Sequence, residues 1–303
     1  MLNYILIITS SYDRTVDYII EKHPNEKFFR FDVDKFSDYS VSAHFGEFTI
    51  SSATKTISNK NCLSIYYRKP SLEDLSGVIS PEYFGFIYKE VFALIDGVAD
   101  SFEGLVLTRP SILRASSNKI TQSSLAHKIG FKTPKHTITN CHQKIKTYFS
   151  SDIIVKPIST GKIKKGEDFE YVQTNLVDDS VSFEKLKYCP SYFQKYIEKD
   201  YECRLTVIEN CYFPVRIISK NKVDWRVNGN SVDYSCMDIP EDIIEKCYKL
   251  MSSLNIEFGC FDFIIKNEEW YFLEVNINGQ WAWLEMDLGI KISDKIIQYL
   301  KGV

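Results

Sequence analysis

Three polar residues near the end of the sequence have the types and spacing of a divalent-cation site. Residues 259–278 alternate apolar and polar positions on both sides of a polar break, with Asp262 in the first half and Glu274-Val275-Asn276 in the second. This alternation predicts two antiparallel strands joined by a turn. Carboxylate and amide oxygens are ligands that suit a hard cation such as Mg²⁺. We therefore predict that Asp262, Glu274 and Asn276 hold magnesium, with oxygens of a bound molecule and water completing its shell.

The length of the turn decides which residues of the two strands face each other. A two-residue turn near Asn267-Glu268-Glu269 would set Phe261 opposite Glu274 and mix apolar with charged side chains. A three-residue turn gives a consistent apolar face with these pairs: Phe261 with Val275, Phe263 with Leu273, and Ile265 with Tyr271. We therefore predict the three-residue turn.

The same register puts Asp262 directly opposite Glu274, with Asn276 on their side of the sheet. Like charges that face each other across a ladder destabilise it, and a cation between them removes that penalty. The alternative is an exposed hairpin with solvated acids. Ile264 and Phe272 are predicted on the acidic face, where unpaired acids would be poor neighbours for them, so we favour the metal site.

The first 110 residues alternate strand and helix patterns and predict a small α/β domain. The predicted elements are strands at Tyr4–Thr9, Phe28–Phe31 and Cys62–Tyr67, a hairpin of Phe45–Ser51 with Ala53–Ile57, and helices at Arg14–Lys22 and Tyr83–Val98. The run Tyr4–Thr9 is continuously apolar, as a parallel strand covered on both faces would be. The domain contains no G-x-G-x-x-G motif, so we expect no dinucleotide site in it.

Two further units complete the predicted fold, which is α/β (α+β) as a whole. Residues 111–190 form the second unit, with a helix capped by Ser116 or Ser117 and stopped by Gly130. Its predicted strands are His136–Thr139, Ile153–Lys156 and Tyr171–Asn175. Residues 191–303 form the third, with antiparallel strands that include Glu202–Ile208 and Tyr212–Ser219. A helix after Pro240 has a predicted apolar stripe of Ile243, Ile244, Cys247, Leu250, Met251 and Leu254.

Composition and charge exclude several classes of function. The formal net charge is −3 with a pI of about 6.0, which argues against a protein held to nucleic acid by phosphate contacts. The eight cysteines have no zinc-ligand spacing and are interpreted as buried, reduced thiols of a cytoplasmic protein. The apolar run at the N-terminus is short and lacks a basic leader and a small-residue cleavage site, so it is interpreted as a buried strand and not as a signal peptide. No stretch approaches the roughly 20 apolar residues of a membrane span.

The order of these motifs resembles the ATP-grasp enzymes, in which an Asp on one strand and Glu-x-Asn on the next bind magnesium and ATP. The resemblance implies three subdomains, with the nucleotide between the central and C-terminal ones. It implies that Lys119 and Lys156 approach the phosphates and that the loop Ser159-Thr160-Gly161 covers them. It also implies that Gln194, Tyr196 and Ile197 belong to a linker that holds the adenine, and that Glu198 or Asp200 reaches the ribose.

A closer resemblance, to the microviridin-type peptide ligases or graspetide synthetases, covers almost the whole chain. The motifs that carry it are Tyr66-Tyr67-Arg68-Lys69-Pro70, Asn118-Lys119 with Gln122, Lys199-Asp200-Tyr201-Glu202-Cys203-Arg204, Asp224-Trp225-Arg226, and Asn276-Ile277-Asn278-Gly279-Gln280-Trp281-Ala282-Trp283. Lys69, where a second arginine is common, and Ile277, which replaces a proline, depart from the pattern. The resemblance implies a ribosomal precursor peptide, with a leader and a core, as the partner. It implies activation of core Asp or Glu carboxylates by ATP as acyl phosphates, then capture by Ser or Thr hydroxyls or Lys amines.

Within this resemblance, three residues are assigned to catalysis. Arg204 is predicted to stabilise the acyl phosphate, and Lys156 to offset phosphate charge. Arg226 is predicted to hold the incoming carboxylate, with a surface pair to Asp224 as the alternative. Arg216 is a weaker candidate, and Arg68 fits either a substrate contact or an ion pair between domains.

Several alternatives stay open at this stage. Trp281 and Trp283 fit either the core, which is the default for aromatic residues, or the wall of a peptide groove. The leader is expected near residues 240–254 and 202–219, and a homodimer is also open. Two other functions share the predicted nucleotide site: an amino-acid ligase acting on a small molecule or a protein terminus, and a nucleotide-binding module without catalysis.

Overall fold

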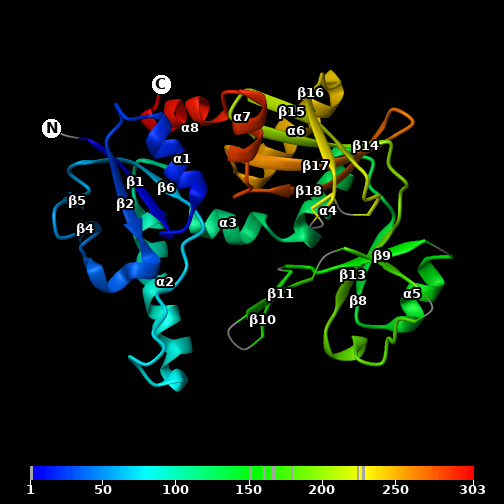
Figure 1. Cartoon of the computed structure of the whole chain (residues 1–303), viewed down its shortest axis with the longest axis horizontal. Helices are drawn as coiled ribbons and strands as arrows, with labels where there is room; N and C mark the ends of the chain where they lie inside the picture. Colours follow the sequence, from blue (N-terminus) through cyan, green and yellow to red (C-terminus); the bar gives the residue numbers. More distant parts are fainter. Residues whose placement is uncertain are drawn as a thin grey trace.

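The computed structural model describes residues 3–150, 152–159, 161–165, 168–172, 174–178, 180–223, 225–226 and 229–303. Figure 1 shows the N-terminal sheet at the left, the C-terminal sheet at the upper right and the central sheet below it. In the part of the chain so described, no helix has the length and apolar character needed to cross a membrane.

The N-terminal unit is a parallel sheet of strand order β2-β1-β6-β7. Its strands are β1 (Tyr4–Thr9), β2 (Phe28–Asp32), β6 (Cys62–Tyr67) and β7 (Leu105–Leu107), and it carries the helices α1 (Arg14–Lys22) and α2 (Phe84–Ser101). Ile5 and Ile7 pack with Val16 of α1 on one face, whereas Leu6 and Ile8 pack toward α2 on the other. The continuous apolar pattern of β1 thus has the predicted cause, burial on both faces.

Residues 40–58 form a three-stranded meander over the α2 face, where the sequence predicted a two-stranded hairpin. Its strands are β3 (Ser40–His44), β4 (Glu47–Ser51) and β5 (Thr56–Ser58). The prediction was wrong because β3 alternates small and polar residues that are mostly exposed, so it lacks the apolar signal of a half-buried strand. Phe45, placed in a strand by the prediction, lies in the turn between β3 and β4.

The central unit is an antiparallel sheet of order β12-β9-β13-β8, packed against one short helix. Its elements are β8 (His136–Thr139), α5 (His142–Tyr148), β9 (Ile153–Lys156), β12 (Asn175–Val177) and β13 (Ser191–Lys195), with a separate hairpin of β10 (Lys162–Lys165) and β11 (Asp168–Tyr171). The predicted strand Tyr171–Asn175 is wrong, because it bridges the end of β11 and the start of β12. The expected boundary at residue 190 falls just before β13, and β13 pairs with β8 and β9.

Two helices lead into the central unit where the sequence predicted one. They are α3 (Pro110–Ser116) and α4 (Lys119–Ile129). The cap of α4 is Asn118, whose side chain accepts from the backbone N–H groups of Ile120 and Thr121, so the prediction of Ser116 or Ser117 was wrong. Ser116 is buried and its hydroxyl donates to the carbonyl of Leu254, a tertiary contact that no local pattern reveals. Gly130 ends α4 in the left-handed region, as predicted.

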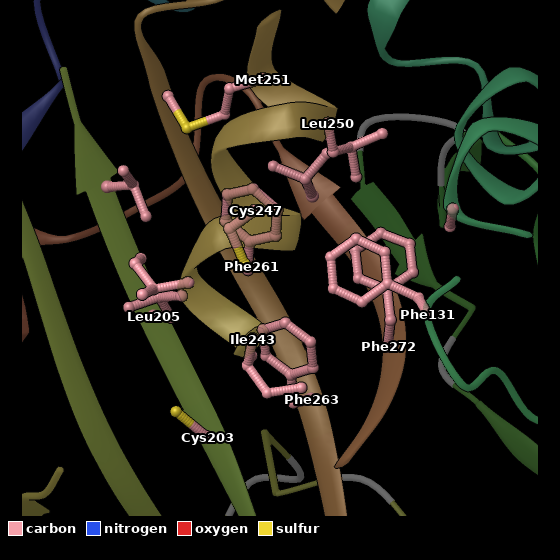
Figure 2. Close-up of a cluster of buried hydrophobic side chains, with 14 of the residues drawn as sticks. Phe131, Cys203, Leu205, Ile243, Cys247, Leu250, Met251, Phe261, Phe263 and Phe272 are labelled. Carbon is pink, nitrogen blue, oxygen red and sulfur yellow. The ribbon is translucent and has the colours of Figure 1, made fainter. Parts of the chain in front are cut away.

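The C-terminal unit is an antiparallel sheet of order β16-β15-β14-β17-β18. Its elements are β14 (Tyr201–Ile208), β15 (Cys211–Ser219), β16 (Val232–Cys236), α6 (Glu241–Leu254), β17 (Phe258–Lys266), β18 (Glu269–Asn276), α7 (Ala282–Leu288) and α8 (Ile292–Lys301). All six residues of the predicted α6 stripe are buried. Figure 2 shows Phe261 and Phe263 of β17 and Phe272 of β18 in one cluster with Cys247 and Leu250 of α6. The opposite face of the sheet is therefore the one available for a site.

The hairpin of β17 and β18 turns through two residues, not three. Asn267 and Glu268 both have positive φ, 49° and 65°, as the tightest hairpin turns require. Near the turn the pairs are Phe263 with Phe272, Ile264 with Tyr271, and Ile265 with Trp270. The predicted pairs of Phe263 with Leu273 and of Ile265 with Tyr271 were therefore wrong.

A β-bulge restores the predicted register farther from the turn. The pairing shifts between Asp262 and Phe263, which adds Leu273 to β18, and Asp262 then faces Glu274 and Phe261 faces Val275. The extra residue also changes the face to which Phe272 points, so this ring is buried in the α6 core and does not flank the acids as predicted. The facing of Asp262 and Glu274 was predicted correctly because the turn is one residue shorter than predicted and the bulge adds one residue, so their effects on the register cancel.

All eight cysteines are free thiols, but only three match the expectation of burial. Cys203, Cys247 and Cys260 are buried, whereas Cys189 and Cys236 are exposed. Burial raises the pKa of the Cys203 and Cys247 thiols. These two therefore act as small apolar core residues.

Candidate active site

The two acids of the hairpin converge on one point of the open sheet face. The amide nitrogen of Asn276 lies 2.9 Å from Oδ2 of Asp262 and 3.5 Å from Oε1 of Glu274. On the other side of Asp262, Nη1 of Arg204 donates to both carboxylate oxygens, at 2.7 and 2.9 Å. Arg204 stands directly opposite Asp262 across the β14–β17 ladder, so the sheet register fixes this contact. The four residues form one charged cluster on neighbouring strands.

The geometry fits a hard cation. Two carboxylates point at the space that one amide group fills, and the amide can present its oxygen instead of its nitrogen by a half-turn about its terminal bond. Asp262, Glu274 and Asn276 would then offer three oxygen ligands to Mg²⁺, which is usually bound through one or two carboxylates together with substrate phosphates.

Both predicted phosphate lysines lie close enough to Glu274 to lower its pKa. Nζ of Lys119, the first residue of α4, is 3.1 Å from Oε2 of Glu274 and donates to the carbonyl of Pro157 at 3.2 Å. Nζ of Lys156, the last residue of β9, donates to Oε1 of Gln194 at 3.2 Å and lies 4.5 Å from the ring centre of Tyr192. The central and C-terminal units therefore meet at this cluster of charges.

The pKa values show how this cluster is balanced. Burial alone would raise the pKa of Glu274, but the charges of Lys119 and Lys156 outweigh it and hold this pKa down at about 2. Burial lowers the pKa of Lys156 to about 8, although Glu274 partly opposes this. A further negative charge nearby would stabilise the protonated form of Lys156 and raise its pKa. The site therefore favours a ligand that carries more negative charge than Glu274 alone.

The adenine linker was predicted at Gln194, Tyr196 and Ile197. Gln194 is buried, and its side chain is the hydrogen-bond partner of Lys156. The backbone N–H of Tyr196 donates to the carbonyl of Asp152 at 2.7 Å. Among the residues that the structure describes, none forms a backbone–backbone hydrogen bond with Ile197.

The covering loop is only partly described. Ser159 is exposed next to Lys156, and Thr160 lies outside the described residues. The carbonyl of Gly161 accepts from the N–H of Val172 at 2.6 Å, and a Cβ at Gly161 would lie 2.4 Å from the carbonyl oxygen of Val172. Glycine is therefore needed at 161 for the close approach of two backbones.

Of the two residues predicted to reach the ribose, Asp200 already forms contacts within the protein. Oδ2 of Asp200 accepts from the N–H of Asn267 at 2.7 Å, and Oδ1 lies 3.2 Å from Nζ of Lys266, so Asp200 holds the β17–β18 turn. Glu198 is exposed.

Glu202, to which the sequence analysis assigned no role, is a buried acid on the same strand as Arg204. It shares a face of β14 with Arg204, it is buried, and it pairs with Lys199 at 2.8 Å. Burial raises the pKa of Glu202, although Lys199 opposes this, and its Oε2 is buried without a partner among the described residues. The two-residue spacing from Arg204 on one strand was the signal that could have revealed it.

Arg68 connects the N-terminal and C-terminal units from a fully buried position. Its Nε lies 3.1 Å from Asp13, and Nη1 donates to Asn278 at 3.2 Å and to the carbonyl of Gly279 at 3.4 Å. Arg68 therefore pairs with an acid of its own unit and reaches the C-terminal unit through hydrogen bonds, so it lies at the domain interface but does not form the ion pair between domains that was one of the two options. Gly279 has no room for a side chain, because a Cβ there would lie 2.9 Å from Nη2 of Arg204. The Asn-Gly-Gln motif thus packs the N-terminal unit against the C-terminal sheet.

Trp225 of the Asp-Trp-Arg motif lies beside the second tryptophan of the C-terminal motif. The rings of Trp225 and Trp283 are 5.4 Å apart, whereas Trp281 is fully buried in the core. Asp224 lies outside the described residues. Arg226 is exposed, and its positive charge is among the lesser influences that lower the pKa of Glu274, after Lys119 and Lys156.

The structure places Arg216 outside the candidate site and Gln122 inside it. Arg216 stands opposite Cys203, on the α6 face of the sheet, and stacks on Tyr201 at 4.1 Å, so it does not join the site. Gln122 of α4 does join it. Its side-chain amide donates to the carbonyl of Val275 at 2.9 Å and accepts from the N–H of Val275 at 3.1 Å, which fixes the backbone between Glu274 and Asn276.

Comparisons with known proteins agree with this geometry. Residues 4–112 match the family described as MvdD pre-ATP grasp domain. Comparison with curated proteins gives no significant match. Among solved structures, the chain is similar to a RiPP-associated ATP-grasp ligase of Chryseobacterium gregarium in complex with ADP and a leader and core peptide. The identity is 27% over 99% of this chain and 96% of that chain, with a TM-score of 0.87.

Two structures from Microcystis aeruginosa are also similar. The macrocyclase MdnB has 26% identity over 98% of this chain and 99% of that chain, with a TM-score of 0.82. The macrocyclase MdnC, bound with the precursor peptide MdnA, has 24% identity over 99% of this chain and 100% of that chain, with a TM-score of 0.88. The predicted resemblance and the predicted fold are confirmed.

Proposed function

Because the chain has the ATP-grasp fold and begins with an MvdD-type pre-ATP-grasp domain, we propose that it is an ATP-dependent ligase of a ribosomal precursor peptide. The observation that carries the proposal is the cluster of Asp262, Glu274 and Asn276 between Lys119 and Lys156. Two converging acids flanked by two lysines match the needs of a magnesium-bound polyphosphate. Peptide substrates are proposed because the Chryseobacterium gregarium ligase, with a leader and core peptide bound, aligns over nearly the whole chain.

The proposed reaction has two steps. A side-chain carboxylate of the core peptide attacks the γ-phosphorus of ATP, the bond from that phosphorus to the β–γ bridging oxygen breaks, and ADP leaves. A Ser or Thr hydroxyl, or a Lys amine, then attacks the carbonyl carbon of the acyl phosphate. The carbon–oxygen bond to phosphate breaks, phosphate leaves, and the proton of the nucleophile passes to phosphate or solvent. The product is an ester or an amide between two side chains of one peptide.

The residues of this chain position the groups and balance their charges. Lys119 and Lys156 would hold the phosphates, and Ile197 would offer its backbone to the adenine. Mg²⁺ on Asp262, Glu274 and Asn276 would supply charge neutralisation of the phosphates.

Two arginines would act on the peptide carboxylate. Arg204 is rigidly placed by Asp262, and its fork would face the acyl phosphate. Arg226, which is exposed beside Trp225, would hold the carboxylate before activation.

The test is incubation of the full chain with ATP, magnesium and a short peptide encoded next to its gene. We expect ADP release that depends on the peptide, and a peptide mass that falls by one water per crosslink. Hydroxide treatment opens esters but leaves amides, which identifies the bond. Glu274→Gln should abolish the mass change, and Glu269→Gln, an exposed acid on the same strand, should not. ADP release with free amino acids, and no change in any peptide, would instead support an amino-acid ligase.

A further inference from the structure

The N-terminal sheet has a topological switch point between β1 and β6. From β1 the chain passes to β2 on one side, and it later returns to β6 on the other side of β1. Figure 1 shows β1 and β6 next to each other. In open parallel sheets, ligands bind beyond the carboxyl ends of the strands at such a point. Residues 10–13 and 68–71 follow these two strand ends, so they are the place to look for a second binding site.

Hydroxyl groups fix the two loops at the switch point. Oγ of Ser10 donates to the carbonyl of Lys69 at 3.0 Å and lies 3.0 Å from Oγ of Ser71. The hydroxyl of Tyr12 also donates to Oγ of Ser71. These contacts hold the backbone of Lys69 at a φ of 46°, a left-handed conformation that a residue other than glycine keeps only when its surroundings enforce it.

The ammonium of Lys69 has no partner within the described part of the chain. The residue is exposed, and the hydrogen bond at Lys69 is made by its carbonyl. Although the side chain reaches solvent, the protein around it excludes enough water that burial lowers the pKa of Lys69 to about 8. Arg68 lowers this pKa further, Asp13 opposes it, and Arg204 of the C-terminal unit lowers it again. Lys69 therefore lies between charges of two units.

The acids beside these arginines are already paired. Asp13 lies 3.1 Å from Nε of Arg68, and Asp262 accepts twice from Nη1 of Arg204. The two arginines and the two acids balance one another. Lys69 adds one positive charge without an anion, and an anionic ligand would remove this imbalance.

Arg204 itself has few donors left for such an anion. Its Nη1 is engaged by Asp262, its Nη2 donates to the carbonyl of Gln280 at 3.2 Å, and its Nε is buried. The side chain of Lys69 is free of such contacts among the described residues and is open to solvent. Lys69 is therefore the better-placed donor for an anion that arrives beside Arg204.

The position of Lys69 separates it from the proposed phosphate contacts. Lys119 and Lys156 have the largest charge effects on Glu274, at the meeting of the central and C-terminal units. The charges with the largest effects on Lys69 are those of its own unit, followed by Arg204. An anion on Lys69 thus reaches Arg204 from the side of the N-terminal unit. In the proposed reaction, the anion that must approach the nucleotide is the acidic side chain of the peptide.

We propose that Lys69 is a substrate-binding residue, which holds the reacting carboxylate of the core peptide beside Arg204 from the side of the N-terminal unit. This proposal rests on the proposed function. The peptide carboxylate would receive this contact in addition to the one from Arg226. A point charge on a flexible stem suits an anion that must still move when it becomes an acyl phosphate.

The test compares two peptides without ATP. One is the precursor peptide encoded beside the gene, and the other is the same peptide with its core Asp and Glu residues replaced by Asn and Gln. Fluorescence anisotropy of the labelled peptides measures their affinity for the full chain. Lys69→Met should weaken binding of the acidic peptide about tenfold, the size of one charge-assisted contact, and leave binding of the amide peptide unchanged.

Two further variants control for charge and for folding. Lys69→Arg keeps the positive charge and should bind the acidic peptide nearly as wild type does. Lys60→Met removes an exposed lysine just before the other end of β6 and should change neither affinity. ADP binding in the absence of peptide should be the same in all variants, which verifies that each one folds.

The outcomes separate this proposal from the proposed function. Condensation of the peptide by wild type, together with equal peptide affinities of wild type and Lys69→Met, would overturn the role of Lys69 and leave the ligase intact. An equal loss for the acidic and the amide peptide would also overturn it, since the contact would then not be with a carboxylate. A wild-type chain that binds neither peptide would overturn both.

Discussion

Replacement of Glu274 by Gln tests the charge balance of the candidate site without any ligand. The substitution keeps the shape of the side chain and removes its charge. In the structure this charge faces Nζ of Lys119 at 3.1 Å, and Glu274 is 19% exposed. The variant therefore leaves Lys119 without its anionic partner and takes away the charge that supports protonation of Lys156.

The size of the effect follows from the pKa of Glu274. This pKa is about 2 in the folded protein and 4.5 as the ordinary value, because the two lysines outweigh the opposing effect of burial. At about 1.4 kcal/mol per pKa unit, the folded state gains about 3 kcal/mol from this carboxylate at pH 7. We expect Glu274→Gln to lower the free energy of unfolding by that amount.

The pH dependence gives a second, independent signature. A carboxyl group whose pKa falls on folding stabilises the protein fully above its unfolded pKa, and this contribution is lost as the pH falls toward the folded pKa. The difference between wild type and variant should thus be constant above about pH 5 and lose roughly 2 kcal/mol by pH 3. Urea unfolding of both proteins without nucleotide, from pH 7 to pH 3, measures it.

Two controls isolate the ion pair. Glu269→Gln removes an acid on the same strand that is 51% exposed, and it should change the unfolding free energy by less than about 0.5 kcal/mol. Glu274→Gln combined with Lys119→Met removes both charges, so its cost should be well below the sum of the two single costs. An unliganded Glu274→Gln protein as stable as wild type at pH 7 would refute the reasoning, since the lysines then do not depend on this carboxylate.

Three further predictions concern the neighbouring groups. Burial lowers the pKa of Lys156 to about 8, and bound phosphates would raise it again, so ADP binding at pH 8 should take up protons and should weaken at higher pH. Calorimetry in two buffers of different ionisation enthalpy measures the proton uptake. A binding heat that does not depend on the buffer would contradict this prediction. Gln122→Leu leaves the backbone of Val275 without its side-chain partner and should cost about 2–4 kcal/mol of unfolding free energy, with weaker magnesium-dependent ADP binding. Arg204→Lys keeps the charge but loses the planar guanidinium, whose Nη1 donates to both carboxylate oxygens of Asp262 while Nη2 donates to the carbonyl of Gln280, so turnover should fall more than ADP affinity; equal losses in both would argue for a purely structural role.

Much of the fold could be predicted because it rests on local signals. The bounds of β1, α1, β6, β8 and β9 and the buried stripe of α6 agree with the predicted ones. Each element has a strong periodic pattern or a continuous apolar run, and such patterns are fixed by which face is buried. β3 and the cap of α4 were predicted wrongly, since β3 has no apolar face and Asn118 competed with two adjacent serines as a capping residue.

The hairpin shows where sequence reasoning ends. The facing of Asp262 and Glu274 was predicted, yet the turn and the position of Phe272 were wrong, because a β-bulge at Leu273 offsets a shorter turn. A bulge adds one residue to a strand and leaves no sequence pattern that marks it. The alternation of apolar and polar residues in the two strands is therefore equally compatible with a bulge and with a turn that is one residue longer. Packing of Phe272 against Phe131 in the α6 core selects the bulged arrangement.

The sequence by itself determined that Glu274 and Asn276 share one face of a strand, since strand alternation has a period of two residues, whereas the bulge decided that Asp262 faces them. Tertiary structure decided what surrounds them. Arg204 reaches Asp262 through the β14–β17 register, and α4 supplies both Lys119, which reaches Glu274, and Gln122, which fixes the strand between Glu274 and Asn276. These contacts join residues far apart in the chain, and their formation depends on how sheets and helices pack, which no local pattern encodes.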